Sequence, residues 1–239
     1  MLTKDLSVKI YADGAELAGI IEMAKNPLIK GFTTNPTLMR KAGIGDYKKF
    51  AIEVLHAVPD RPISFEVFSD DFDEMYEQAM EIASWGKNVN IKVPVTNTEK
   101  EFSGKLITRL SEKGVFVNVT ALMTLQQVNE VMDCLRGDAP AYISVFAGRI
   151  ADTGRDPMPI MSEAATISRQ RPNTEIIWAS PRELFNIFQA NEAGVQIITV
   201  ANDILNKLSN VGKDLDEYSL ETVKMFRNDA VKAGFTIDK

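Results

Sequence analysis

Eight short runs rich in β-branched residues alternate with longer helical patterns along almost the whole chain. Eight strand-then-helix units within 239 residues, with no Pro- or Gly-rich linker between them, predict an α/β fold, a (β/α)8 TIM barrel. A doubly wound open sheet is the alternative, but no Gly-rich dinucleotide turn follows the first run. The expected strands are residues 8–13, 31–35, 63–68, 89–95, 115–120, 142–148, 175–180 and 197–202.

Apolar and polar residues alternate within several of these runs. Successive side chains of a strand point to opposite faces, so the apolar set would pack beneath the helices and the polar set would face the barrel axis. Barrel active sites lie at the carboxyl ends of the strands. We therefore expect a site built from polar residues within the strands or near their ends, namely Asp13, Asn35, Ser64, Glu66, Asn90, Lys92, Asn118, Thr120, Ser144 and Ser180.

The domain organisation is expected to be simple. We predict a single barrel domain over residues 1–239, with residues 213–239 as a C-terminal helical extension. The ending VGKDLDEYSLETVKMFRNDAVKAGF has the pattern of an amphipathic helix. The pattern alone leaves open whether this helix caps its own barrel.

Composition excludes several classes of function. The net charge of −6 argues against a nucleic-acid-binding surface or attachment to anionic lipid, though it permits a local basic pocket. The N-terminal residues lack the apolar core of a signal peptide, and no apolar run has membrane-spanning length. The single Cys134 fits a reducing cytoplasm, so we expect a cytoplasmic protein. The single His56 argues against a histidine-rich zinc site or a catalytic triad, and no metal is expected.

Lys92 stands inside the otherwise apolar run NVNIKVPVT. Lysine is seldom buried, so its position needs a reason. One reason is a core ion pair with Glu66 or Asp13. The other is chemical: burial disfavours the charged form of an amine, and a neutral amine attacks a ketone to form a Schiff base. The iminium nitrogen of a Schiff base can draw electrons from a breaking carbon–carbon bond.

The segment SPRE predicts the start of a helix at the mouth of the barrel. Ser180 would be the N-cap, Pro181 the first helical residue and Glu183 the third, as in a capping box. The N–H groups of such a helix start suit a phosphate group. Arg182 and Arg149 would add charge-assisted hydrogen bonds. The alternative for Arg149 is an ion pair with Asp152 or Asp156 in its own loop.

Eight segments along the chain resemble, in order, those of the compact transaldolases, which are related to the bacterial fructose-6-phosphate aldolases. They are YADGA, KGFTTNPTL, FEVF, IKVPVT, VNVTALMT, ISVFAGRIADTGRD, WASPRE and YSLETVKMFRNDA. TTNP and IKVP are quite specific together. The resemblance implies a class I mechanism that needs no cofactor, with Lys92 as the Schiff-base lysine.

The resemblance also implies roles for the other site residues. Asp13 would move protons at the substrate hydroxyl, and Glu66 with Thr120 would hold a catalytic water. Thr33 and Asn35 would hydrogen-bond the sugar hydroxyls, although Asn35 before Pro36 also suits a helix N-cap. The remaining substrate-binding residues would be Ser144, Arg149, Ser180 and Arg182.

Two positions separate transaldolases from the related aldolases. Glu66 stands where the aldolases typically carry glutamine, and Phe146 where they carry tyrosine. The resemblance therefore implies a transaldolase of the pentose phosphate pathway. It would transfer a dihydroxyacetone unit from sedoheptulose 7-phosphate or fructose 6-phosphate to glyceraldehyde 3-phosphate or erythrose 4-phosphate.

Two other readings stay open, a fructose-6-phosphate aldolase and a non-catalytic sugar-phosphate-binding barrel. Gly14 stands where the family commonly has threonine, and TVAND lacks a frequent proline. In compact relatives the C-terminal helix reaches a neighbouring subunit, so the resemblance implies a homo-oligomer. The expected partners are sugar phosphates, with neither nucleic acid nor a membrane.

Overall fold

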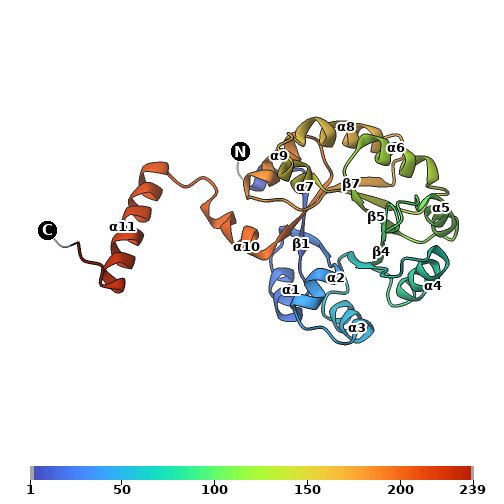
Figure 1. Ribbon diagram of the computed structural model, residues 1–239, viewed down its shortest axis with the longest axis horizontal. Coiled ribbons are helices and arrows are strands. Elements are labelled where there is room, and N and C mark those ends of the chain that lie inside the picture. The colour runs from blue at the N-terminus through green and yellow to red at the C-terminus, as the bar shows by residue number, and fades with distance from the viewer. Residues whose placement is uncertain (1–2, 238–239) are drawn as a thin grey trace.

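The computed structural model describes residues 3–237, and eight parallel strands close into a barrel in sequence order (Figure 1). This confirms the predicted fold. The fifth expected strand begins two residues later than predicted, and the second begins two residues earlier. The strands are β1 Lys9–Asp13, β2 Ile29–Thr33, β3 Ile63–Glu66, β4 Val89–Pro94, β5 Val117–Leu122, β6 Ala141–Val145, β7 Thr174–Trp178 and β8 Ile197–Ala201.

Helices surround the barrel and fill the connections between its strands (Figure 1). A short 3-10 turn at Thr3–Asp5 precedes the first strand. The helices are α1 Leu17–Ala24, α2 Pro36–Lys41, α3 Tyr47–Ala57, α4 Phe72–Ala83, α5 Gly104–Glu112, α6 Leu125–Cys134, α7 Ala147–Asp152, α8 Met158–Ser168, α9 Phe185–Glu192, α10 Asn202–Leu205, the 3-10 helix Asn206–Asn210 and α11 Leu215–Ala233.

The main hydrophobic core lies between the strands and the surrounding helices. Phe65, Ile91 and Val119 are fully buried in it, as the alternating pattern predicts. The polar partners in the same strands face the barrel axis, where Ser64, Asn90 and Asn118 are also fully buried. The barrel interior is therefore a packed polar layer beneath the carboxyl ends of the strands.

Two tyrosines fill the interior nearer the amino ends of the strands. The hydroxyls of Tyr11 and Tyr142 lie 2.7 Å apart, and burial raises the pKa of Tyr142 to about 12. Gly31 makes room for this pair, because a Cβ there would lie 2.5 Å from the Tyr11 ring. A side chain at position 31 would thus displace the ring beneath the polar layer.

The C-terminal helix α11 stands apart from the barrel (Figure 1). It begins at Leu215, where Asp214 caps its first turn, and it buries no side chain. The predicted C-terminal helix is therefore confirmed, and in this structure it does not cap its own barrel. Within residues 3–237, no helix combines the length and the apolar composition that crossing a membrane requires.

Candidate active site

A cavity of about 460 Å³ opens at the carboxyl ends of the strands. It is lined by nine of the ten residues to which the resemblance assigns a catalytic or substrate-binding role, contributed by seven of the strands or the segments that follow them. These nine are Asp13, Thr33, Asn35, Glu66, Lys92, Thr120, Ser144, Arg149 and Ser180. The tenth, Arg182, is not among the described residues that line the cavity.

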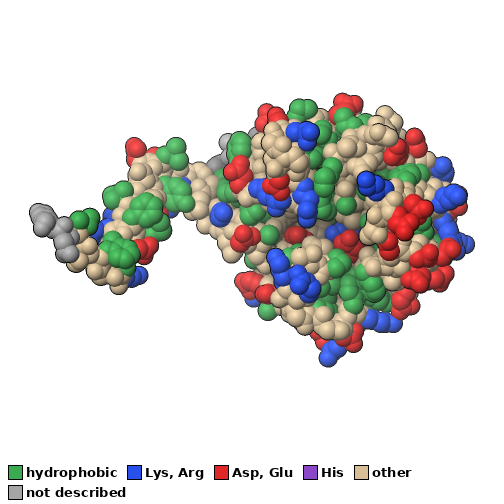
Figure 2. All heavy atoms as spheres, viewed as in Figure 1, with side chains coloured by type: hydrophobic (Ala, Val, Ile, Leu, Met, Phe, Trp, Pro, Cys, Tyr) green, Lys and Arg blue, Asp and Glu red, His purple; other side chains and the backbone are tan. Residues whose placement is uncertain are grey.

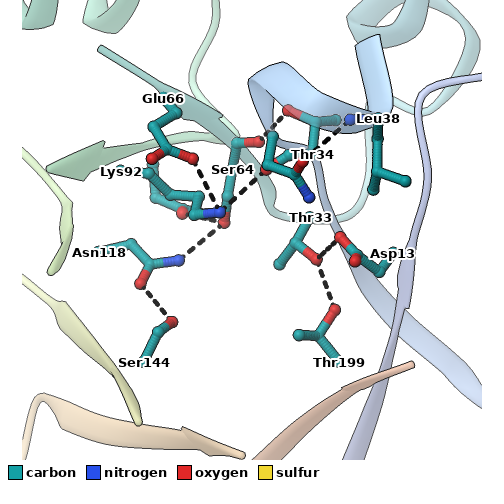
Figure 3. A network of polar contacts seen from close by, with 12 residues as sticks. Asp13, Thr33, Thr34, Leu38, Ser64, Glu66, Lys92, Asn118, Ser144 and Thr199 are labelled. Carbon is teal, nitrogen blue, oxygen red and sulfur yellow. Dashed lines mark hydrogen bonds and ion pairs between the residues drawn. The ribbon is translucent and has the colours of Figure 1, made fainter. Parts of the chain in front are cut away.

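Lys92 lies deep in this cavity, only 7% exposed (Figure 3). It is paired in register with Glu66 of the neighbouring strand, so the two side chains emerge side by side. Lys92 Nζ lies 3.1 Å from Glu66 Oε2 and donates a 3.0 Å hydrogen bond to the carbonyl of Thr34. The predicted ion pair therefore exists, and it leaves the amine facing the cavity.

Asp13 lies across the cavity from this pair (Figure 3). Thr33 Oγ1 donates a 2.7 Å hydrogen bond to Asp13 Oδ1 and lies 2.5 Å from Thr199 Oγ1, so Thr199 is the donor to Thr33. Burial raises the pKa of the Asp13 carboxyl, while Lys92 and the bond from Thr33 oppose that rise. Asp13 is consequently a carboxyl that takes and returns a proton more readily than an exposed aspartate.

The end of β5 carries a strained backbone. The pairing of β5 with β6 shifts register between Val119 and Leu122, and Ala121 has a left-handed φ of 68°. Such strain in a residue other than glycine is often found at functional sites. The adjacent Thr120 hydroxyl is buried in the cavity wall without a hydrogen-bond partner among residues 3–237. It is thus available to a ligand in the cavity.

A chain of hydrogen bonds crosses the floor of the cavity (Figure 3). Ser144 Oγ donates to Asn118 Oδ1 at 2.7 Å, and Asn118 Nδ2 donates to Ser64 Oγ at 3.1 Å. Ser64 in turn bonds Asn90. Because its proton is engaged by Asn118, Ser144 can only accept a hydrogen bond from a ligand.

Asn35 caps helix α2, as its position before Pro36 predicts. Its Oδ1 accepts a 3.0 Å hydrogen bond from the Leu38 N–H, and Pro36 is the first helical residue. Asn35 also lines the cavity, and within residues 3–237 the N–H donors of its side-chain amide are left for a ligand.

The predicted capping box at Ser180 is wrong. Helix α9 begins only at Phe185, and Ser180 has a left-handed φ of 57°. Asn186 Oδ1 instead accepts hydrogen bonds from the backbone N–H groups of Arg182 and Glu183, at 2.7 and 3.0 Å. These N–H groups are therefore engaged, and the expected helix start at the barrel mouth is not formed. Ser180 nevertheless lines the cavity.

The two predicted arginines have different surroundings. Arg149 lines the cavity, with its guanidinium 5.9 Å from the centre of the Phe146 ring. Arg182 instead forms a bidentate ion pair with Asp152, in which Nε donates a 3.0 Å hydrogen bond to Oδ1. Asp152, one of the two aspartates expected as a partner for Arg149, thus pairs with Arg182.

Two residues at the site were not singled out from the sequence. Thr199 shares the inward face of β8 with Ile197, so the period-two alternation could have indicated it. Tyr47 forms hydrogen bonds with the backbone of Glu66. It begins a helix 19 residues earlier in the chain, and no sequence pattern indicates that it would lie at the site. Among residues 3–237, no three His, Cys, Asp or Glu side chains are grouped so that they could hold a metal ion.

The fold and the cavity define a (β/α)8-barrel protein whose buried lysine and carboxylates meet at the carboxyl ends of the strands. A family model described as Transaldolase/Fructose-6-phosphate aldolase matches residues 10–237, and the chain belongs to this family. The protein is thus an enzyme of the transaldolase and aldolase type.

Relatives named "Probable transaldolase" match most of the chain. The relative from Thermoanaerobacter sp. is 35% identical over 96% of this chain and 100% of its own. The relative from Dehalococcoides mccartyi is 34% identical over 84% of this chain and 90% of its own. The relative from Caldicellulosiruptor saccharolyticus is 35% identical over 84% of this chain and 89% of its own.

Proposed function

We propose that the protein is a transaldolase that works through a Schiff base on Lys92. The observation that carries this proposal is the contact of 3.1 Å between Lys92 and Glu66 in a cavity that Asp13 also lines. A buried amine held beside carboxylates suits covalent catalysis on a ketone. A barrel that only bound sugar phosphates would need no such amine.

The proposed reaction begins when Lys92 gives a proton to the adjacent Glu66 carboxylate, and the neutral amine attacks the C2 carbonyl of a ketose phosphate to form a carbinolamine. Glu66 then returns this proton to the C2 hydroxyl through a water that Glu66 and Thr120 hold, so that the hydroxyl leaves as water and an iminium forms. Asp13 then takes the proton of the C4 hydroxyl, and C4 becomes the carbonyl of the departing aldose phosphate. The electron pair of the broken C3–C4 bond moves between C2 and C3 and neutralises the iminium as an enamine.

The second half of the reaction reverses these steps with a new aldehyde. The enamine carbon C3 attacks the C1 aldehyde of the acceptor, and Asp13 returns its proton to the oxygen that becomes the new hydroxyl. Hydrolysis of the iminium frees the product and Lys92. Proposed donors are fructose 6-phosphate and sedoheptulose 7-phosphate, and proposed acceptors are erythrose 4-phosphate and glyceraldehyde 3-phosphate, as in the pentose phosphate pathway.

The substrate phosphate is proposed to bind near Arg149 and Ser180, which both line the cavity from segments that touch at Gly148. Arg149 would supply charge-assisted hydrogen bonds. Arg182 can join it only if the ion pair with Asp152 opens. Thr33, Asn35 and Ser144 would contact the sugar hydroxyls.

Phe146 favours transaldolase over fructose-6-phosphate aldolase. It lines the cavity but offers no hydroxyl to move a proton, whereas the related aldolases carry tyrosine there. An enamine that no nearby group protonates persists until an acceptor arrives. Glu66, which stands where the aldolases typically carry glutamine, also favours transaldolase.

The Schiff base is tested by replacing Lys92. We expect Lys92→Met to abolish turnover, because no amine remains, while fructose 6-phosphate still binds in a calorimetric titration. Reduction of the wild-type mixture with borohydride should attach the sugar to Lys92, detectable by peptide mass spectrometry. Wild-type turnover in Lys92→Met would refute the enzyme mechanism, and binding without any wild-type turnover would favour a sugar-phosphate sensor.

We also propose that the chain is one barrel domain over residues 1–239 whose extension, residues 213–239, joins copies into a homo-oligomer. The support is the row of large apolar side chains that the extension exposes (Figure 2). The proposed location is the cytoplasm, and neither nucleic acid nor a membrane is proposed as a partner.

A further inference from the structure

Tyr47, the first residue of α3, contacts the site through the backbone of Glu66. Its hydroxyl donates a 2.7 Å hydrogen bond to the Glu66 carbonyl and accepts a 2.8 Å bond from the Glu66 N–H. One side-chain oxygen therefore satisfies both main-chain groups of the residue whose carboxylate reaches Lys92.

The need for this contact follows from the short pairing of β2 with β3. Within the described chain these strands pair only at two positions, the last being Thr33 with Ser64. The Thr34 N–H still donates to the Ser64 carbonyl at 3.2 Å, and at Asn35 the chain then turns into α2. β2 has thus ended where it would have to pair with Glu66.

The other side of β3 cannot supply the missing partners. In a parallel sheet, alternate residues of a strand direct their N–H and C=O groups to opposite neighbours. The Val67 N–H donates to the Lys92 carbonyl of β4, so Glu66, one residue earlier, faces the side that β2 has left. The Tyr47 hydroxyl takes the place of a strand there, because a buried N–H and C=O would otherwise lack partners.

The Tyr47 ring is held firmly enough to act as such a substitute. It packs against Phe68, Trp85 and Phe65, with ring centres 5.6, 5.9 and 6.3 Å away. Burial also raises the pKa of Tyr47, so its hydroxyl keeps the proton that it donates.

We propose that Tyr47 is a positioning residue for catalysis, which fixes the end of β3 so that the Glu66 carboxylate meets Lys92. This inference rests on the proposed function. Without the hydroxyl, the backbone of Glu66 is free to shift and the carboxylate moves away from the amine. Small displacements of catalytic groups are costly, so the rate of Schiff-base formation should depend on Tyr47 although Tyr47 touches no substrate.

The test is a double-mutant cycle with Tyr47→Phe and Glu66→Gln, measured well below the unfolding temperature. We expect Tyr47→Phe to lower kcat about tenfold with little change in KM. In the Glu66→Gln background the same change should alter kcat by less than about twofold, because Tyr47 acts only through that carboxylate. The control is Tyr76→Phe, since the Tyr76 hydroxyl makes no hydrogen bond within the described part of the chain.

Two results would overturn the inference. One is a wild-type kcat in Tyr47→Phe. The other is a kcat in the double variant that falls by the product of the two single-variant factors, as a merely structural role of Tyr47 would produce. Borohydride trapping separates this failure from that of the proposed function. A wild-type protein that traps no ketose on Lys92 refutes the function, whereas a Tyr47→Phe variant that traps ketose at the wild-type rate refutes only the role of Tyr47.

Discussion

At the scale of single residues, the protonation of Asp13 controls the proposed chemistry. Asp13 must be ionised to take the C4 proton, yet burial raises its pKa and favours the protonated form. The positive charge of Lys92 and the hydrogen bond from Thr33 hold that pKa down. The acidic limb of the pH–rate profile should therefore lie above the range of an exposed aspartate, about pH 4.

This balance predicts the effect of removing the Thr33 hydroxyl. Thr33→Val takes away a bond that lowers the pKa of Asp13, so the ionised form is lost at a higher pH and the acidic limb of kcat moves upward. Thr199→Val should cause a smaller shift, because its hydroxyl reaches Asp13 only through Thr33. An acidic limb that stays in place in Thr33→Val would show that another group titrates there.

At the scale of elements, the first turn of α7 meets the loop after β7 at one glycine. A Cβ on Gly148 would lie 1.5 Å from the carbonyl oxygen of Ser180, so the helix and the loop touch backbone to backbone. This contact keeps Arg149 and Ser180 on one wall of the cavity. Ser180 has a left-handed backbone conformation at this contact, so it is not the N-cap of a helix.

Gly148→Ala should consequently destabilise the fold, because backbone rather than a movable side chain meets the new methyl group. We expect a loss of about 3 kcal/mol in the free energy of unfolding, measured by urea denaturation. Gly45→Ala is the matched control, since a Cβ there meets no atom within 4 Å and its backbone is not left-handed. Equal stability of the two variants would contradict the assigned contact.

The strands and most of the site could be predicted because their signals are local. The alternation of polar and apolar residues along the strands predicts that Glu66, Lys92 and Thr120 face the barrel axis. Several other site residues are predicted because they stand at the ends of the expected strands. The start of α9 could not be predicted, since the local preference of Ser180 for capping yields to its contact with Gly148. The position of Tyr47 also depends on tertiary contacts alone.

At the scale of the whole molecule, the extension exposes more apolar surface than a stable monomer favours. Nine large apolar side chains between Leu215 and Ile237 are at least 44% exposed, and Phe226 is 64% exposed. Figure 2 shows hydrophobic side chains along this arm, which stands clear of the barrel. Burying them against another copy would remove that surface from water.

Phe226→Asp should weaken this association without disturbing the barrel, because α11 buries no side chain in the single chain. Light scattering after size exclusion is expected to give a multiple of the 26.5 kDa chain mass for the wild type and a lower mass for the variant. Lys224→Asp is the control for added negative charge on the same helix. A monomeric wild type at micromolar concentration would refute the proposed assembly.

In the proposed reaction, an enamine on Lys92 waits for an acceptor aldehyde. The most direct test is to incubate the protein with fructose 6-phosphate and to measure glyceraldehyde 3-phosphate with and without erythrose 4-phosphate. We predict release that depends on erythrose 4-phosphate, with no free dihydroxyacetone. Release of glyceraldehyde 3-phosphate together with free dihydroxyacetone in the absence of an acceptor would contradict this account and identify an aldolase.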